Sequence, residues 1–144
     1  MHSIVRFRGV PEAPGVARKM VRDTLGAAHP KFRDVELIVS ELTTNAVLHS
    51  RSGEDGYFWV EIGQWGDRLR IAVFDEGPAK KSRTGRPADE VGFFGRGLTI
   101  VFALADEWGH NFEGQGAQSL WVELASPAED LPQLQEEKST PRGV

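Results

Sequence analysis

Two neighbouring segments of this sequence alternate apolar and polar side chains, a pattern that predicts strands with one buried face. They are "YFWVEIGQ" (57–64) and "RLRIAVFDE" (68–76), and the intervening "WGD" favours a tight turn. The two strands are therefore predicted to form an antiparallel hairpin. A sheet that contains this hairpin needs other elements to cover its apolar face.

The order of the remaining elements restricts the fold further, because helical and strand-like segments are segregated. The order is β-α-α-β-β-loop-α-β-β, which predicts an α+β two-layer sandwich. We expect a mixed, mainly antiparallel sheet with about three helices on one face. The elements other than the first hairpin are a strand at 3–9, helices at 12–28, 32–50 and 97–109, and a second hairpin at 107–113 and 118–125.

The composition is that of a globular protein with one core. The chain has 144 residues, the size of one ordinary domain, and 40% of them are hydrophobic. It has no cysteine, which excludes disulfides, thiolate metal sites and cysteine nucleophiles. The longest apolar run, 98–105, is too short to cross a bilayer, and the N-terminus lacks the pattern of a signal peptide. We therefore expect a cytoplasmic protein that does not bind membranes.

Charge is distributed unevenly along the chain. Seventeen basic and 21 acidic residues give a net charge of −4, which argues against direct binding to duplex nucleic acid. The stretch 126–144 is polar, contains proline and is mostly acidic, so we expect one domain at 1–125 followed by a disordered tail. A basic Gly/Pro-rich loop at roughly 77–96 is longer than most loops in compact domains and indicates a lid or binding loop.

The predicted helix at 32–50 carries a column of polar side chains, Glu41, Asn45 and His49, at intervals of four residues. The column lies beside the apolar stripe and therefore along the edge of the core. A buried carboxylate is unfavourable unless it is paired or holds a metal ion or a proton. Taken alone, the column is more typical of a helix edge whose side chains bond neighbouring backbone. The stripe comprises Val35, Ile38, Val39, Leu42 and Ala46.

Two glycine-containing motifs follow the column along the chain. "VFDEG" places Asp75 at a strand end and Gly77 two residues later, and "GFFGRGLTIV" precedes the third helix. Asp-x-Gly is a common turn, and a glycine before a helix can ease entry into it. A glycine-rich loop that leads into a helix also offers free backbone N–H groups to phosphate. The P-loop motif is absent, and the Gly-x-Gly does not directly follow a strand, which argues against a Rossmann site.

The three motifs in this order resemble the Bergerat-type ATP site of the GHKL superfamily. Over residues 3–125, and especially in "SELTTNAVLHS" and "GRGLTIVFALADEWG", the chain is similar to anti-sigma-factor serine kinases of the RsbW/SpoIIAB type. It is also similar to small regulatory ATP-binding proteins of actinobacteria. The resemblance implies the Bergerat fold, ATP and Mg²⁺ as cofactors, and a histidine kinase-like ATPase domain that regulates transcription.

The resemblance also assigns roles to individual residues. Glu41 would be the general base that takes the proton of an attacking hydroxyl, and Asn45 would bind the Mg²⁺ that bridges the ATP phosphates. Asp75 would accept a hydrogen bond from the adenine amino group, and Gly77 would let the backbone approach the base. His49 is expected to fill the helix edge.

The phosphates would be held where the third helix begins. Gly95 and Gly97, with the helix N-terminus at Leu98, would cradle them, and Arg96 would reach a phosphate. Residues 78–94 would form the ATP lid. Its basic residues would help to hold an anionic ligand or partner: Lys80, Lys81, Arg83 and Arg86.

Two features depart from the superfamily pattern. Proline follows Gly77, where many members have one residue and then a second glycine. No threonine occurs in "GQGAQSLWVEL", where the final motif of the superfamily is expected. Ser119 is the predicted substitute that would support Asp75 and the adenine, and Gln118 is the alternative.

The function implied by the resemblance is an anti-sigma factor with serine kinase activity on an anti-anti-sigma (STAS) partner, with a sigma factor as second partner. A homodimer is compatible with it. The alternative is a non-catalytic ATP-binding module that exchanges partners with nucleotide, but retention of Glu41 favours a kinase. A histidine kinase domain is the third hypothesis, and the absence of a segment for the dimerisation helices argues against it.

Overall fold

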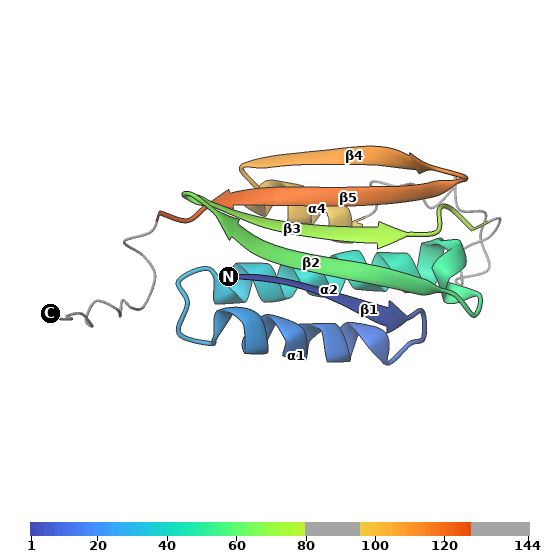
Figure 1. The fold of residues 1–144 in the computed structure, drawn as a ribbon, viewed down its shortest axis with the longest axis horizontal. Helices are drawn as coiled ribbons and strands as arrows, with labels where there is room; N and C mark the ends of the chain where they lie inside the picture. The colour runs from blue at the N-terminus through green and yellow to red at the C-terminus, as the bar shows by residue number, and fades with distance from the viewer. Residues whose placement is uncertain (80–95, 128–144) are drawn as a thin grey trace, which may run out of the picture.

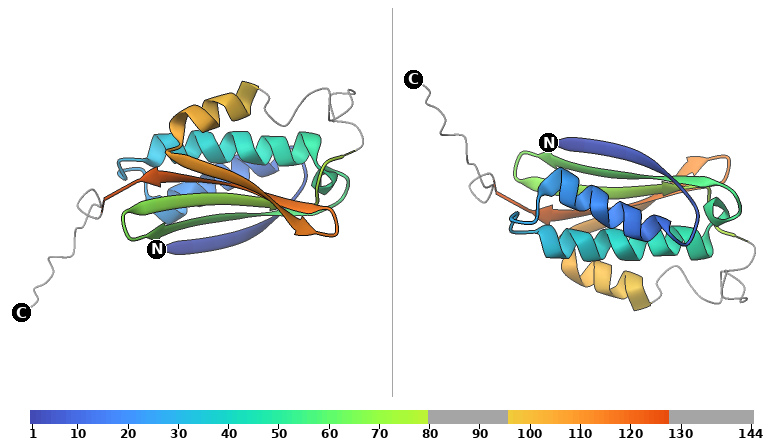
Figure 2. Two further views of the ribbon diagram at one scale, coloured as in Figure 1. Left: turned by 90° about the horizontal axis from the view of Figure 1, so that it is seen from above. Right: turned by 90° about the horizontal axis from the view of Figure 1, so that it is seen from below.

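The computed structural model describes residues 1–79 and 96–127. Five strands form one sheet in the order β1-β2-β3-β5-β4, and the helices lie on one face of it (Figures 1 and 2). The fold is therefore the predicted α+β two-layer sandwich. The elements are β1 (His2–Arg8), α1 (Ala13–Leu25), α2 (Phe32–His49), the short 3-10 helix η1 (Arg51–Gly53), β2 (Tyr57–Trp65), β3 (Arg68–Asp75), α4 (Arg96–Leu104), β4 (Glu107–Gly114) and β5 (Ala117–Ala125).

The sheet is more uniform than the sequence predicts, because all four strand pairings in the described residues are antiparallel. A mixed, mainly antiparallel sheet was expected. The reason lies in the second hairpin. Strand β4 runs in the direction of β3, but β5 folds back and inserts between them. The parallel pairing that β3 and β4 would have made is thereby replaced by two antiparallel ones.

Helix α2 carries the largest share of the helical core. Its predicted apolar stripe is confirmed, since Leu42 is 2% exposed and the other four members are fully buried. The stripe packs against the inner face of the sheet, where alternate residues of the central strands are buried, including Phe58, Val60, Ile71 and Val122. The period-two pattern of the strands and the helical period of α2 thus meet in one core.

Two helices differ in detail from the sequence prediction. In α1, Val16 is 51% exposed, because Ala13 and Ala17 occupy the core-facing positions instead. Helix α4 ends at Leu104, five residues before the predicted end. The chain joins the sheet directly afterwards: the backbone N–H of Asp106 donates to the carbonyl of Glu123, and the Asp106 carboxylate accepts from the N–H of Ala125.

The C-terminal end of the described chain is attached to the sheet. Ser126 is fully buried, its N–H donates to the carbonyl of Asp67, and its own carbonyl accepts from the Gln64 amide at 2.8 Å. Ser126, the first residue of the segment predicted as a tail, is thus packed against the sheet, whereas 128–144 lie outside the described residues. None of the helices in the described part combines the length and apolar character needed to span a membrane.

Candidate functional site

A small pocket lies between α2 and the inner face of the sheet, near the end of β3. It unites residues from four elements that are far apart in the sequence. Asn45 of α2 faces it together with Asp75 of β3, as the motif order predicts. Its lining comprises Leu42, Asn45, Val73, Asp75, His110, Gln118 and Leu120.

Asp75 is the buried acid of this pocket, with 8% of its surface exposed. Its Oδ1 accepts a hydrogen bond from the backbone N–H of Gly77 at 2.8 Å, and its side chain is also hydrogen-bonded to Gln118. Burial raises the pKa of the Asp75 carboxyl above its ordinary value, although these two bonds and the nearby His110 lower it. A buried carboxylate with few partners is suited to recognise a ligand's hydrogen-bond donor.

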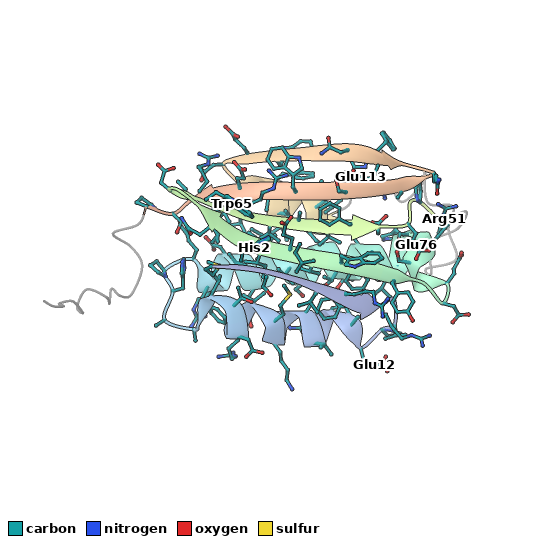
Figure 3. All side chains as sticks on the ribbon, in the orientation of Figure 1. His2, Glu12, Arg51, Trp65, Glu76 and Glu113 are labelled. Carbon is teal, nitrogen blue, oxygen red and sulfur yellow. The ribbon has the colours of Figure 1, made fainter. Side chains whose placement is uncertain are left out.

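Gly77 lies at a point where three chain segments meet. Its φ of +94° favours glycine, and a Cβ at this position would lie 1.9 Å from the carbonyl oxygen of Gly116. The N–H of Arg51 donates to the Gly77 carbonyl at 2.8 Å, and the Arg51 guanidinium donates to the carbonyl of Glu76. Figure 3 shows Arg51 and Glu76 together at this end of the molecule. The backbone alone therefore requires glycine here, independently of any ligand.

Glu41 lies against the first turn of α4. A Cβ added to Gly97 would lie 2.1 Å from Oε1 of Glu41, so the carboxylate occupies the space that a larger residue at this position would fill. Glu41 is half-buried. The N-terminal end of a helix carries partial positive charge and attracts a carboxylate or a phosphate. The structure thus brings Glu41, Asn45 and the beginning of α4 to one side of α2.

Some predicted site residues contribute differently or cannot be placed. Leu98 is 3% exposed and belongs to the core, which leaves only its backbone for a ligand. Gly95, the side chain of Arg96 and the basic residues Lys80, Lys81, Arg83 and Arg86 lie outside the described residues, as does most of the predicted lid 78–94.

The first two residues of that predicted lid are attached to the end of α2. Pro78 forms an isolated bridge with Ser50, and the buried Ala79 donates its N–H to the carbonyl of His49 at 3.0 Å. The His49 side chain does not line the pocket. His49 therefore contacts this segment through its backbone.

The structure does not bring Ser119 into the pocket. Asp75 is directly opposite Gln118 in the sheet, whereas Ser119 is opposite Phe74 and lies on the other face. The Ser119 hydroxyl donates instead to the Glu113 carboxylate at 2.6 Å. Of the two substitutes weighed for the missing threonine, Gln118 is the one beside Asp75, because alternation along a strand places neighbours on opposite faces.

His110 is a pocket residue that sequence reasoning did not identify. It lies on β4, and its Nε2 is 2.9 Å from Oε1 of Gln118. The alternation of the second hairpin predicts which residues share a face with His110. Only the pairing of β4 with β5 places the His110 side chain in contact with Gln118.

Comparisons with known proteins agree with this arrangement. The family model described as "Histidine kinase-like ATPase domain" matches residues 7–122. A serine-protein kinase RsbW of Bacillus pumilus is 32% identical over 113 residues, which cover 67% of this chain and 70% of the relative. RsbW of Bacillus subtilis is 30% identical over 111 residues, or 67% and 69% of the two chains.

A solved structure has the same fold. It contains the RsbU and RsbW domains of Rv1364c from Mycobacterium tuberculosis, with a TM-score of 0.58 and 21% sequence identity. The similarity covers 87% of this chain and 34% of the longer solved chain.

Proposed function

Because this chain belongs to the histidine kinase-like ATPase family and is of the RsbW type, we propose that it binds ATP in the pocket between α2 and the sheet and acts as a protein serine kinase. The observation that carries the proposal is that Asn45 and Asp75 line the same pocket. Glu41 lies one turn before Asn45 on α2 and is packed against the beginning of α4. A structural network alone would not require a buried acid beside a pocket.

Asp75 would select the base. Adenine offers an exocyclic amino group as donor, and a buried carboxylate that already receives Gly77 N–H on Oδ1 has an acceptor to spare. The hydrogen bond between them would form where water is excluded, which strengthens it.

Asn45 suits a magnesium ion. Its amide oxygen is a hard, neutral ligand, and Mg²⁺ usually keeps several waters and takes few protein ligands beside the phosphates. Within residues 1–79 and 96–127, no group of three or more acidic or histidine side chains could hold a metal ion. The Asn45 amide oxygen, the phosphate oxygens and water would together supply the oxygen ligands that Mg²⁺ prefers. When bound, the ion would neutralise charge that develops on the phosphates.

Glu41 would act as the general base. It is only half-buried, and it lies beside Gly97, where the phosphates would meet the helix N-terminus. Glu41 would take the serine proton as the γ-phosphoryl group is transferred.

The partners follow from the resemblance to the RsbW type. We propose that the substrate is a serine of an anti-anti-sigma (STAS) protein and that a sigma factor is the second partner, which would make the chain an anti-sigma factor. Such a protein would work in the cytoplasm, where transcription takes place. The name shared by these relatives, serine-protein kinase, supports the kinase step.

Transfer of label from γ-labelled ATP to candidate STAS proteins of the same genome tests the proposal. Glu41→Gln keeps the shape of the side chain and should leave ATP binding intact, but it should slow transfer roughly 10²–10⁴-fold. Glu36→Gln, on another side of α2, is the matched control and should change neither property. Normal transfer by a folded Glu41→Gln protein would contradict the role of Glu41, and intact ATP binding without any transfer by the wild type would leave a nucleotide-dependent binding module.

A further inference from the structure

Asp75, Gln118 and His110 form a chain of hydrogen bonds across the floor of the pocket. The Gln118 side chain bonds the Asp75 carboxylate on one side and His110 Nε2 on the other, with 2.9 Å between Nε2 and Oε1. The three residues come from β3, β5 and β4, and all line the pocket. Gln118 is 7% exposed, so water competes little for its amide.

The direction of each bond follows from the chemistry of the groups. An ionised carboxylate can only accept, so Gln118 must present its NH₂ group to Asp75. Its Oε1 then faces His110 and must accept, so His110 must carry a proton on Nε2. The imidazole thereby fixes the orientation of an amide that could otherwise rotate. Phe112, opposite Gln118 in the sheet, lies with its ring centroid 5.0 Å from that of His110.

We propose that His110 and Gln118 are positioning residues that hold Asp75 as a hydrogen-bond acceptor and so set the preference for adenine over guanine nucleotides. The proposal rests on the proposed function of the pocket. Gln118 would act directly on Asp75, and His110 would act through Gln118.

The preference arises at position 6 of the purine ring, the group that we place against Asp75. Adenine has an amino donor where guanine has the O6 acceptor. A carboxylate held as acceptor binds the first and repels the second, whereas a protonated Asp75 could donate to O6. Among the described residues, the ionisable side chains that influence the pKa of Asp75 by their charge are His110, which lowers it, and Glu76, which raises it. The donor from Gln118 favours the ionised form of Asp75, so loss of that donor should relax the choice of base.

A purely structural role makes a different forecast. The same bonds connect β3 to the second hairpin, and their loss would then lower stability and weaken ATP and GTP binding equally. The ratio of the two affinities separates the alternatives, since it is insensitive to the fraction of folded protein.

The test measures the Kd for ATP and for GTP by calorimetry in four variants and the wild type. His110→Leu and Gln118→Leu should each reduce the ATP-over-GTP ratio about 3- to 10-fold, the worth of one hydrogen bond. His110→Gln, whose amide can donate near the position of Nε2, should restore most of the ratio. His2→Leu is the matched control, because His2 bonds Glu61 and contacts Trp65, and none of these three residues lines the pocket. Figure 3 shows His2 beside Trp65.

A second measurement uses the wild-type protein alone. Nitrogen-15 NMR should show the His110 ring protonated on Nε2. A ring protonated only on Nδ1, or an unchanged ATP-over-GTP ratio in folded Leu variants, would overturn the inference while leaving the kinase proposal intact. A wild type that binds neither nucleotide would overturn the proposed function and the inference together.

Discussion

At the scale of single residues, Asp75 combines burial with the need to accept hydrogen bonds. Two donors, Gly77 N–H and Gln118, offset only part of the loss of water, so burial is the dominant influence on its pKa. In the unliganded protein the ionised form of Asp75 is therefore less favourable than it is in the unfolded chain. A ligand that supplies a further hydrogen-bond donor would make the ionised form more favourable.

A pH dependence of stability follows from this residue. The pKa of Asp75 is raised from 3.8 in the folded protein, so between 3.8 and the raised value the folded state binds more protons than the unfolded state. The free energy of unfolding should then fall as pH rises through that window. Urea unfolding at a series of pH values should show the wild type losing stability relative to Asp75→Asn across the window. If the free energies of unfolding of the two proteins changed with pH in the same way, burial would not raise the pKa of Asp75.

Gly97 offers a second prediction, at the contact with Glu41. A methyl group at Gly97 would collide with the Glu41 carboxylate, the free end of a flexible side chain. Gly97→Ala should therefore move the carboxylate away while leaving the melting temperature almost unchanged, since alanine also favours the helix. Phosphoryl transfer should decline at least about 10-fold, because a general base acts only within hydrogen-bond reach.

The control for this change is Gly15→Ala in α1. A Cβ there meets only Arg18, at an ordinary distance of 3.6 Å, so activity and stability should both be retained. Full transfer activity in Gly97→Ala would show that Glu41 does not need its observed position.

At the scale of elements, the end of β3 depends on two neighbours that are remote in sequence. Strand β3 is followed by Gly77, whose carbonyl accepts from Arg51 of η1 and whose α-carbon faces Gly116 of the β4–β5 turn. This arrangement places Asp75 at a fixed point above α2. The junction of these three elements thus positions the pocket acid.

Gly77→Ala should loosen that junction. The positive φ alone costs about 1–3 kcal/mol for a residue with a side chain, and the Cβ would in addition lie 1.9 Å from the Gly116 carbonyl oxygen. Gly26→Ala is the matched control, because φ is +84° there but no atom lies within 4 Å. Chemical unfolding should show a larger loss for Gly77→Ala than for Gly26→Ala, and equal losses would exclude the close approach as a cause.

At the scale of the whole molecule, ligand binding should stabilise the fold as a unit. Any ligand that binds only the folded state adds about 2.7 kcal/mol at 100 times its Kd, which for a domain of this size corresponds to a rise of several degrees in melting temperature. The pocket joins α2 to strands β3, β4 and β5, so one ligand would contact both layers.

Differential scanning calorimetry with ATP, with and without Mg²⁺, measures this effect. We expect ATP with Mg²⁺ to raise the melting temperature more than ATP alone, and Asn45→Ala to lose the additional rise because its amide oxygen is the proposed ligand. The part of the rise due to ATP alone should persist in the variant. An Asn45→Ala protein that retains the full response to Mg²⁺ would mean that the ion binds elsewhere.

The sequence by itself was sufficient for the features that depend on local pattern. Strand and helix periods predicted the order of elements, the two-layer class and the buried stripe of α2, because a residue's face along one element follows from its spacing alone. The motif order likewise predicted Glu41, Asn45 and Asp75 as members of one site. Asn45 and Asp75 do line one pocket, and the chain matches the family model.

Only the tertiary structure decided what depends on the pairing of remote segments. Whether Gln118 or Ser119 faces Asp75 is a matter of strand register, and a slip of one residue exchanges the two faces. The insertion of β5 between β3 and β4, the bond from His110 to Gln118 and the closeness of Glu41 to Gly97 have the same origin. Each of these contacts is fixed by the packing of one complete element on another, so the spacing of residues within a single element does not predict it.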